Sequence, residues 1–312
     1  MIDVHQHILP ARYVQEVGEA YITAQGSSTR LPPWSVEGAL QGMDAAGIRT
    51  AINSISAPGF APLAAAPAAA LARWCNELAA QIGADHPGRF GFFAALPLPD
   101  IDASLREVEH GFDRLGADGV CVLTHHGGHY LGSALYDPLY EELDRRGAVV
   151  FVHPTAPASM QLVAGLSPST LEFPFDTTRA VADIVLAGVL TRYPRIRWIF
   201  SHAGGAIPYL AGRVELLTTN KPALRERIPQ GFSAELRKLY FDCALSLSPT
   251  TLDALVAEVG MDRLLFGSDY PFGPKDQMTT AARGIAALPW SEDRKQQLRS
   301  GNAAQLFPRW RA

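Results

Sequence analysis

The chain has 312 residues, of which 47% are hydrophobic and 19% charged, and its formal net charge is −4. This balance is typical of a globular protein with a large core, and without a Lys/Arg run it argues against binding to nucleic acid or to an anionic membrane. No apolar run approaches the ~20 residues that span a bilayer, and no basic segment precedes an apolar stretch at the start, so we expect no membrane anchor and no signal peptide. The three cysteines, Cys75, Cys121 and Cys243, are widely spaced, which favours a reducing compartment and a cytoplasmic location.

Short apolar runs and helical patterns alternate along the chain. The predicted strands cover residues 1–10, 48–55, 90–96, 119–123, 148–152, 196–201, 239–243 and 264–267. Helical spacing of apolar residues lies between them at 11–20, 35–46, 101–115, 137–146, 176–193, 206–217, 249–259 and 278–288, and a loop at 58–67 turns into an alanine-rich helix that ends at residue 85. We also expect a loop insertion at about 19–34 and a C-terminal helix at about 291–306.

Eight strands that alternate with helices predict the α/β class. Most of the strands are continuous apolar runs, which is typical of a parallel sheet covered by helices on its faces. The number of units favours a closed (β/α)8 TIM barrel over an open doubly wound sheet, and no Gly-x-Gly-x-x-Gly motif follows any strand. No composition shift marks a domain boundary, so we expect a single barrel domain over residues 1–312.

His5 and His7 lie two residues apart in the first predicted strand. Because side chains alternate along a strand, both imidazoles are expected on one face, with Val4, Gln6 and Ile8 on the other. Two imidazoles on one face make half of a metal site, although a pair of hydrogen-bonded core histidines has the same pattern.

Three more residues of ligand or acid–base type come at the ends of predicted strands. His153 follows the strand at 148–152, His202 follows the one at 196–201, and Asp269 comes just after the one at 264–267. A single histidine at a strand end is often structural. Barrel enzymes, however, have their active sites at the C-terminal ends of the strands, and five such residues at one rim indicate a metal-centred active site.

The motifs at these strand ends resemble the amidohydrolase superfamily. They are Asp-x-His-x-His at 3–7, His-Pro at 153–154, Ser-His-Ala-Gly-Gly at 201–205 and Gly-Ser-Asp-Tyr-Pro-Phe at 267–272. More closely, they are similar to the branch that contains aminocarboxymuconate-semialdehyde decarboxylase and the salicylate-, resorcylate- and 6-methylsalicylate-type decarboxylases. The segment 171–179 resembles the 6-methylsalicylate group in particular.

The resemblance implies one divalent metal ion, most often zinc and sometimes manganese. His5, His7, His153 and Asp269 match the ligands, and His202 matches a residue beside the metal that acts as an acid or base or orients a bound water. Binuclear relatives have a carboxylated lysine at the fourth strand end, whereas residues 119–125 contain no lysine, so we expect one metal rather than two.

The residues that contact the substrate are less clearly indicated by the resemblance than the metal ligands are. Arg213 matches an arginine that in some members reaches the site of a neighbouring subunit and binds a substrate carboxylate, which implies a homodimer; a salt bridge on the helix surface is the alternative. His125, in the polar segment 124–130, either lines the pocket or caps a helix end as part of a flexible loop. Phe272 either faces an aromatic substrate ring or packs in the core.

Two aspartates near the rim are expected to have supporting roles. Asp3 is predicted to orient a ligand imidazole, and Asp242, at the end of the seventh strand, is predicted to make a structural hydrogen bond.

The first functional hypothesis is a metal-dependent, non-oxidative decarboxylase of a small, salicylate-like carboxylic acid. Asp269 or His202 would deliver a proton to the ring carbon as carbon dioxide leaves. The second hypothesis is a hydrolase of a lactone or amide, or a hydratase, in which the metal activates water and His202 is the general base. A metal-binding barrel without enzymatic activity is the third.

Overall fold

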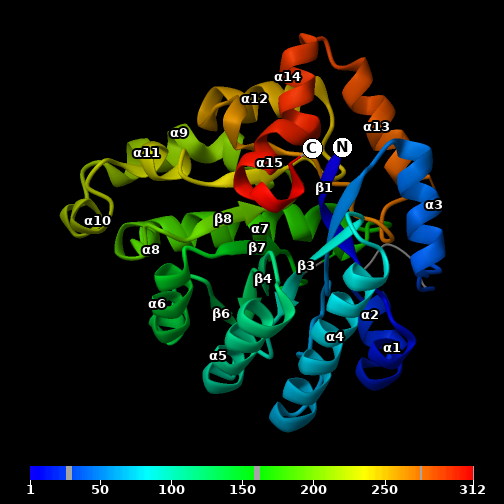
Figure 1. Cartoon of the computed structure of the whole chain (residues 1–312). Coiled ribbons are helices and arrows are strands. Elements are labelled where there is room, and N and C mark those ends of the chain that lie inside the picture. Colours follow the sequence, from blue (N-terminus) through cyan, green and yellow to red (C-terminus); the bar gives the residue numbers. More distant parts are fainter. Residues whose placement is uncertain (26–29, 158–161, 275, 312) are drawn as a thin grey trace.

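The structure, a computed structural model, describes residues 1–25, 30–157, 162–274 and 276–311. Within these ranges the main sheet consists of parallel strands arranged in the order of the chain (Figure 1). They are β1 (Ile2–His7), β2 (Thr50–Ser54), β3 (Phe90–Ala95), β4 (Gly119–Leu123), β7 (Val149–His153), β8 (Arg197–Phe200), β9 (Tyr240–Asp242) and β10 (Leu264–Leu265).

The first strand and the segment at the end of the sheet close the barrel. The amide of Val4 donates to the carbonyl of Phe266 at 2.9 Å, and the amide of His7 donates to the carbonyl of Tyr270 at 2.7 Å. In the other direction, the amide of Asp269 donates to the carbonyl of His5 at 2.9 Å. The predicted (β/α)8 barrel is therefore confirmed, and its closure brings Asp269 beside β1.

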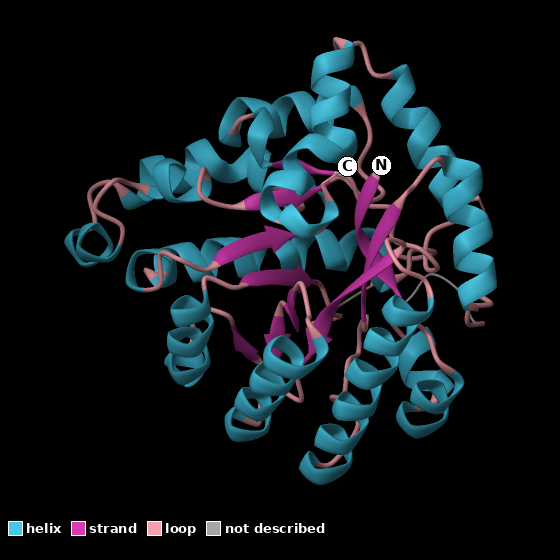
Figure 2. Ribbon diagram, viewed as in Figure 1, coloured by secondary structure: helices cyan, strands magenta, loops and turns pink. Residues whose placement is uncertain are grey.

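Helices surround the strands on the outside (Figure 2). They are α1 (Ala11–Val17), α2 (Glu19–Thr23), α3 (Val36–Ala46), α4 (Ala65–Asp85), α5 (Ile101–His110), α6 (Asp137–Arg146), α7 (Pro168–Leu186), α8 (Val189–Arg192), α9 (Ile207–Thr218), α10 (Pro222–Arg227), α11 (Phe232–Leu236), α12 (Pro249–Val259), α13 (Gln277–Ala287), α14 (Glu292–Gln296) and α15 (Asn302–Leu306). Among the described residues, no helix is both long and apolar enough to cross a membrane.

Local sequence explains where the clearest helix begins and ends. The hydroxyl of Ser35 accepts a hydrogen bond from the amide of Gly38 at 3.0 Å and so caps the first turn of α3. Gly47 ends the same helix with a φ of 68°, a left-handed conformation that glycine adopts without a steric penalty.

Several helices differ from the prediction. Helix α7 begins at Pro168 rather than at residue 176, because a proline is tolerated in the first turn and Pro174 inside the helix does not end it. Helix α2 lies inside the predicted loop insertion, of which residues 26–29 fall outside the described ranges. The short helices α10 and α11 were not predicted.

The predicted C-terminal helix is present in three pieces. A π-helical turn at Gln297–Gly301 joins α14 to α15, and the hydroxyl of Ser291 caps α14. The single domain over residues 1–312 stays a prediction.

Alternating side chains divide the core into an inner and an outer cluster. On β4, Cys121 packs with Ile52, Phe93 and Phe151 in one cluster of buried residues. Its neighbours Val120 and Val122 belong to the larger cluster between the sheet and the helices, together with residues of α6 and α7. On the strands away from β1, every second side chain therefore points into the barrel.

Candidate metal centre and active site

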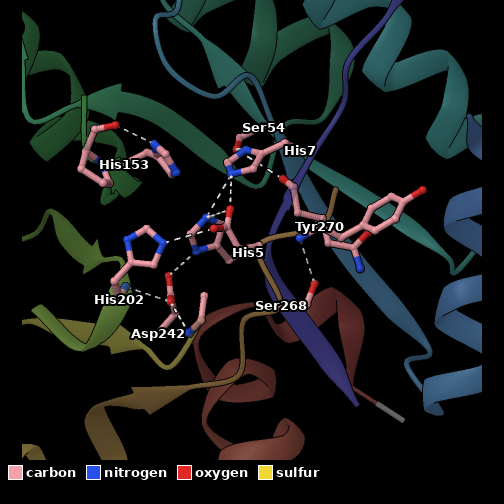
Figure 3. Close-up of polar contacts among 12 residues, drawn as sticks. His5, His7, Ser54, His153, His202, Asp242, Ser268 and Tyr270 are labelled. Atoms are coloured by element: carbon pink, nitrogen blue, oxygen red, sulfur yellow. Dashed lines mark hydrogen bonds and ion pairs between the residues drawn. The ribbon is translucent and has the colours of Figure 1, made fainter. Parts of the chain in front are cut away.

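Four buried side chains converge at the carboxyl end of the barrel. His5 and His7 come from β1, His153 from the end of β7, and Asp269 from the segment after β10. One ligand atom of each lies within 4.8 Å of the other three. The Nε2 atoms of His5 and His7 are 3.0 Å apart, and each is 3.2 Å from Oδ1 of Asp269. Figure 3 shows the imidazoles directed toward one another.

Hydrogen bonds to the Nδ1 atoms fix the orientation of all three imidazoles. His5 donates to a carboxylate oxygen of Asp242 at 2.9 Å, and His153 donates to the carbonyl of Pro154 at 2.8 Å. His7 Nδ1 lies 2.9 Å from the hydroxyl of Ser54, which donates its own proton to the carbonyl of Gln6 and so accepts from the ring. Because Nδ1 is the donor in each ring, the neutral form of each imidazole leaves Nε2 with a free lone pair, and this is the form that binds a metal.

These residues fit a divalent metal. Oδ1 of Asp269 is buried and lies between two imidazoles, yet it has no hydrogen-bond partner among the described residues. Burial lowers the pKa of His7 to about 4 and the pKa of His153 well below its usual range, so both rings are neutral. Burial alone would also lower the pKa of His5, but the carboxylates of Asp242 and Asp269 outweigh it and raise that pKa to about 10. Three imidazoles and one carboxylate are a donor set typical of zinc, with an open position for a further ligand.

The register of β1 explains how both histidines reach the site. Pairing of β1 with β2 is irregular between Asp3 and Gln6. Val4 packs in the inner cluster, although His5 next to it also points into the barrel, where its ring lies 4.9 Å from that of Phe151. The prediction that Val4 and His5 lie on opposite faces of the strand is therefore wrong. The irregular pairing between Asp3 and Gln6 is a β-bulge, and it turns both side chains into the barrel.

His202 lies directly beside the ligands. Its Nε2 is 3.4 Å from Oδ2 of Asp269, and its ring centroid is 5.1 Å from that of His5. Its Nδ1 is buried and has no hydrogen-bond partner within the described ranges.

The backbone after β8 is left-handed at four successive residues, His202 to Gly205, with φ between 56° and 71°. A Cβ on Gly204 would lie 2.6 Å from the ring of Phe241, and one on Gly205 would lie 2.0 Å from the carbonyl of Pro174. The two glycines of the Ser-His-Ala-Gly-Gly motif therefore permit the turn that holds His202 at the metal site.

Of the two supporting aspartates, Asp242 makes the structural hydrogen bonds predicted for it, whereas Asp3 has a role other than the predicted one. Asp242 orients the ring of His5, and its other oxygen accepts the amides of His202 at 3.1 Å and Ala244 at 2.9 Å. Asp3 touches no imidazole: it accepts the amides of His5 and Ser268, each at 3.1 Å, and the side chain of Gln6 at 2.8 Å. Asp3 thus fixes the backbone that bears the ligands, and the ring-orienting role predicted for it belongs to Asp242.

The predicted substrate contacts lie at different distances from the metal ligands. The ring of Phe272 is 5.6 Å from that of His7, so it lies at the site. The ring of Phe173, on α7, lies 6.0 Å from the ring of His153. Arg213 lies on α9, where its side chain is exposed.

The segment 124–130 is a hairpin rather than a flexible loop. β5 (His125–His126) and β6 (His129–Tyr130) pair in antiparallel fashion across Gly127 and Gly128, which both have positive φ. A Gly-Gly pair between two short runs is a signal for such a turn. None of these histidines caps a helix as predicted: His126 Nε2 accepts the amide of Leu123, and His125 Nε2 lies 3.9 Å from a carboxylate oxygen of Asp176.

Comparison with known proteins agrees with the fold. An amidohydrolase family model matches residues 2–309. The chain is 38% identical over 314 residues to 6-methylsalicylic acid decarboxylase of Penicillium expansum, an alignment that covers 99% of this chain and 96% of the relative.

Two solved structures are also similar. A crystal structure of an amidohydrolase II has a TM-score of 0.90 and 27% identity, and covers 98% of this chain and 99% of its own. A crystal structure of 2,6-dihydroxybenzoate decarboxylase complexed with 2,6-dihydroxybenzoate has a TM-score of 0.82 and 25% identity, and covers 98% and 97%. The chain belongs to the amidohydrolase family, and its relatives include decarboxylases of hydroxyaromatic acids.

Proposed function

We propose that this protein is a metal-dependent, non-oxidative decarboxylase of a small hydroxyaromatic acid of the salicylate type. The observation that supports this best is the full-length similarity to a 6-methylsalicylic acid decarboxylase, combined with a complete metal-ligand set at the barrel mouth. The enzyme is a carboxy-lyase: the bond between the ring carbon and the carboxylate breaks, and carbon dioxide leaves.

His5, His7, His153 and Asp269 would hold the metal, which we propose to be one Zn²⁺, with Mn²⁺ as the alternative. When bound, the metal supplies positive charge that polarises substrate oxygens. The chain itself supplies the proton. As carbon dioxide departs, its former bonding electron pair stays on the ring carbon, and that carbon receives a proton from His202 or Asp269, whose Nε2 and Oδ2 lie 3.4 Å apart.

Aromatic side chains lie on two sides of the ligand cluster, as a substrate ring requires. Phe272 lies next to His7, and Phe173 lies next to His153. We propose that Phe272 contacts the substrate ring. We also propose that His125, whose two ring nitrogens are buried without hydrogen-bond partners among the described residues, lines the polar side of the pocket.

A homodimer with Arg213 at the site of the neighbouring subunit is proposed for the same enzyme. Helix α9, which bears Arg213, exposes large apolar side chains: Tyr209 is 89% exposed and Leu216 is 74% exposed. Exposed apolar groups around an exposed arginine on one helix support contact with a second copy. The cytoplasmic location stays a prediction.

The test is product analysis with purified, metal-assayed protein. We expect metal-dependent release of carbon dioxide from a hydroxybenzoate in a panel that includes 6-methylsalicylate, with loss of activity on chelation and recovery when Zn²⁺ or Mn²⁺ is returned. Turnover of a lactone or amide without carbon dioxide, or net addition of water, would instead assign the protein to the hydrolases or hydratases of this family. Carbon dioxide release that survives complete removal of the metal would contradict the proposed mechanism.

A further inference from the structure

The strands opposite the metal ligands present small and apolar side chains to the same barrel mouth. On β7 the inward residues are Phe151 and then His153, at the carboxyl end. On β4 the matching pair is Cys121 and Leu123, and Leu123 is the direct partner of His153 in the β4–β7 ladder. On β3, Phe93 pairs with Gly119 and Ala95 pairs with Cys121, whose partner on β7 is Phe151. Leu123 therefore occupies the layer of the barrel in which β7 presents a metal ligand, and Ala95 lies one inward-facing position deeper.

A small cavity lies among these side chains. Its volume is about 20 Å³, which is room for one group the size of a water molecule or a methyl group. The cavity is lined mainly by apolar side chains, among them Ile55, Phe60, Ala95, Leu98, Cys121 and Leu123.

Two residues that line the cavity are next to residues that contact the metal ligands. Ile55 directly follows Ser54, whose hydroxyl holds the ring of His7. Leu123 packs with Phe173 in a cluster of buried residues, and the ring of Phe173 lies against that of His153. A ring held at the metal between Phe173 and Phe272 thus has this apolar recess on the β2–β4 side.

The recess has little to offer a polar substituent. The two polar side chains that line it are already engaged: Nε2 of His126 accepts the amide of Leu123 at 3.0 Å, and the thiol of Cys121 donates to the carbonyl of Ile55 at 3.6 Å. Burial lowers the pKa of His126 to about 3, so the ring is neutral at physiological pH. A hydroxyl group placed there would lose its hydrogen bonds to water, whereas a methyl group would not.

We propose that this recess receives a one-carbon apolar substituent of the substrate ring, and that Ala95 and Leu123 set the size of substituent that the enzyme accepts. The inference rests on the proposed function, because it assumes a hydroxybenzoate at the metal. Ala95 and Leu123 would determine specificity, while the proton transfer would still be carried out by His202 or Asp269.

The experiment compares ring substituents on one scaffold. Salicylate and its 6-methyl, 6-ethyl and 6-hydroxy derivatives are offered to the metal-loaded enzyme, and kcat/KM for carbon dioxide release is measured together with Kd from calorimetry. We expect the 6-methyl compound to exceed the 6-hydroxy compound by about tenfold or more in kcat/KM, the range in which small differences in an apolar pocket discriminate.

Two variants change the recess in opposite directions. Ala95→Val should fill it and lower kcat/KM for the 6-methyl compound about tenfold, with salicylate itself little affected. Leu123→Ala should enlarge it and raise the ratio of 6-ethyl to 6-methyl turnover. Val122→Ala is the matched control, because Val122 is the next residue along β4 but packs toward the helices, so its truncation loosens the same strand without changing the recess. Thermal unfolding and metal content establish that each variant is folded and loaded.

The outcomes separate the two proposals. If the wild type, Ala95→Val and Leu123→Ala all release carbon dioxide with the same substituent preference, the proposed role of the recess is wrong. The proposed decarboxylase function would still hold. A methyl preference in Kd that Ala95→Val abolishes, without carbon dioxide release from any hydroxybenzoate, would retain the recess and reject the decarboxylase. Should Ala95→Val not fold, the Leu123→Ala ratio decides alone, and an unchanged ratio counts against the recess.

Discussion

The barrel mouth has two sides of opposite chemistry. One side, formed by β1, β7, β9 and the segments after β8 and β10, presents four imidazoles and the carboxylates of Asp242 and Asp269. The other side, at the ends of β3 and β4, presents Leu123 beside His153 and Ala95 beside Cys121. Hydrogen bonds set positions on the first side, and packing volume does so on the second. We therefore expect changes on the polar side to alter metal content or kcat, and changes on the apolar side to alter substrate preference.

The most damaging change on the polar side should be Asp269→Asn. This substitution removes the ligand charge and the oxygen next to His202, and we expect kcat to fall by about 1,000-fold or more, because the charge stabilisation that a metal supplies amounts to several kcal/mol. Unfolding temperature should stay close to that of the wild type, since the side chains are nearly the same size. Steady-state kinetics, atomic absorption and thermal unfolding measure these quantities. Retained activity would remove Asp269 from the mechanism.

His202→Gln separates the chemical step from metal binding. His202 contacts Asp269 but is not one of the four clustered ligands, so metal content should stay at the wild-type level while kcat falls about 100-fold or more, as is usual on loss of a general acid or base. Metal content is measured on the same samples. A variant that loses its metal together with its activity would show that His202 helps to hold the ion instead.

Asp242→Asn tests the hydrogen bond behind a ligand. The amide cannot accept the Nδ1 proton of His5 as strongly as the carboxylate does, so we expect metal affinity to fall about 10- to 100-fold, with activity recovered at excess metal. Asp118→Asn is the matched control, because Asp118 is a carboxylate buried at the opposite end of β4, where it binds Arg309 and Trp310. Equal losses of metal affinity in both variants would mean that any buried carboxylate matters equally.

The sequence predicted the ligand side of the mouth much better than the other side. His153, His202 and Asp269 stand at the ends of apolar runs, and a parallel barrel brings all strand ends to one rim, so their convergence follows from topology alone. The roles of Asp3 and Asp242 were not separable in this way. Both are buried aspartates next to strand ends, and which of them contacts the ring of His5 depends on the bulge in β1 and on how the closed barrel places the end of β9 beside that ring.

The recess on the apolar side could not be predicted from the sequence. Ala95 and Leu123 are ordinary residues of buried strands, and only the volume left between side chains from different strands makes them a recess. The hairpin at 125–130 was not predicted for a different reason: its Gly-Gly pair is a turn signal, but each of its two strands is only two residues long, too short for an alternating pattern to show.

The mildest expected effect on the polar side belongs to Arg213, which is proposed to act on the site of the partner subunit. Arg213→Ala should raise KM for carboxylate substrates about tenfold with little change in kcat, since one charge-assisted contact is lost. Arg237→Ala provides the control, because Arg237 is also exposed and follows the neighbouring helix α11.

A mixed dimer tests the proposed geometry directly. When Arg213→Ala chains are refolded or co-expressed with inactive Asp269→Asn chains, one of the two sites in a mixed dimer has an intact metal centre from the first chain and an intact Arg213 from the second. KM measured on the mixed dimer, separated from both homodimers by a different tag on each chain, should return to the wild-type value, because its one intact metal centre receives its arginine from the other chain. If Arg213 served its own subunit, every site with Asp269 would still lack it, and KM would remain raised.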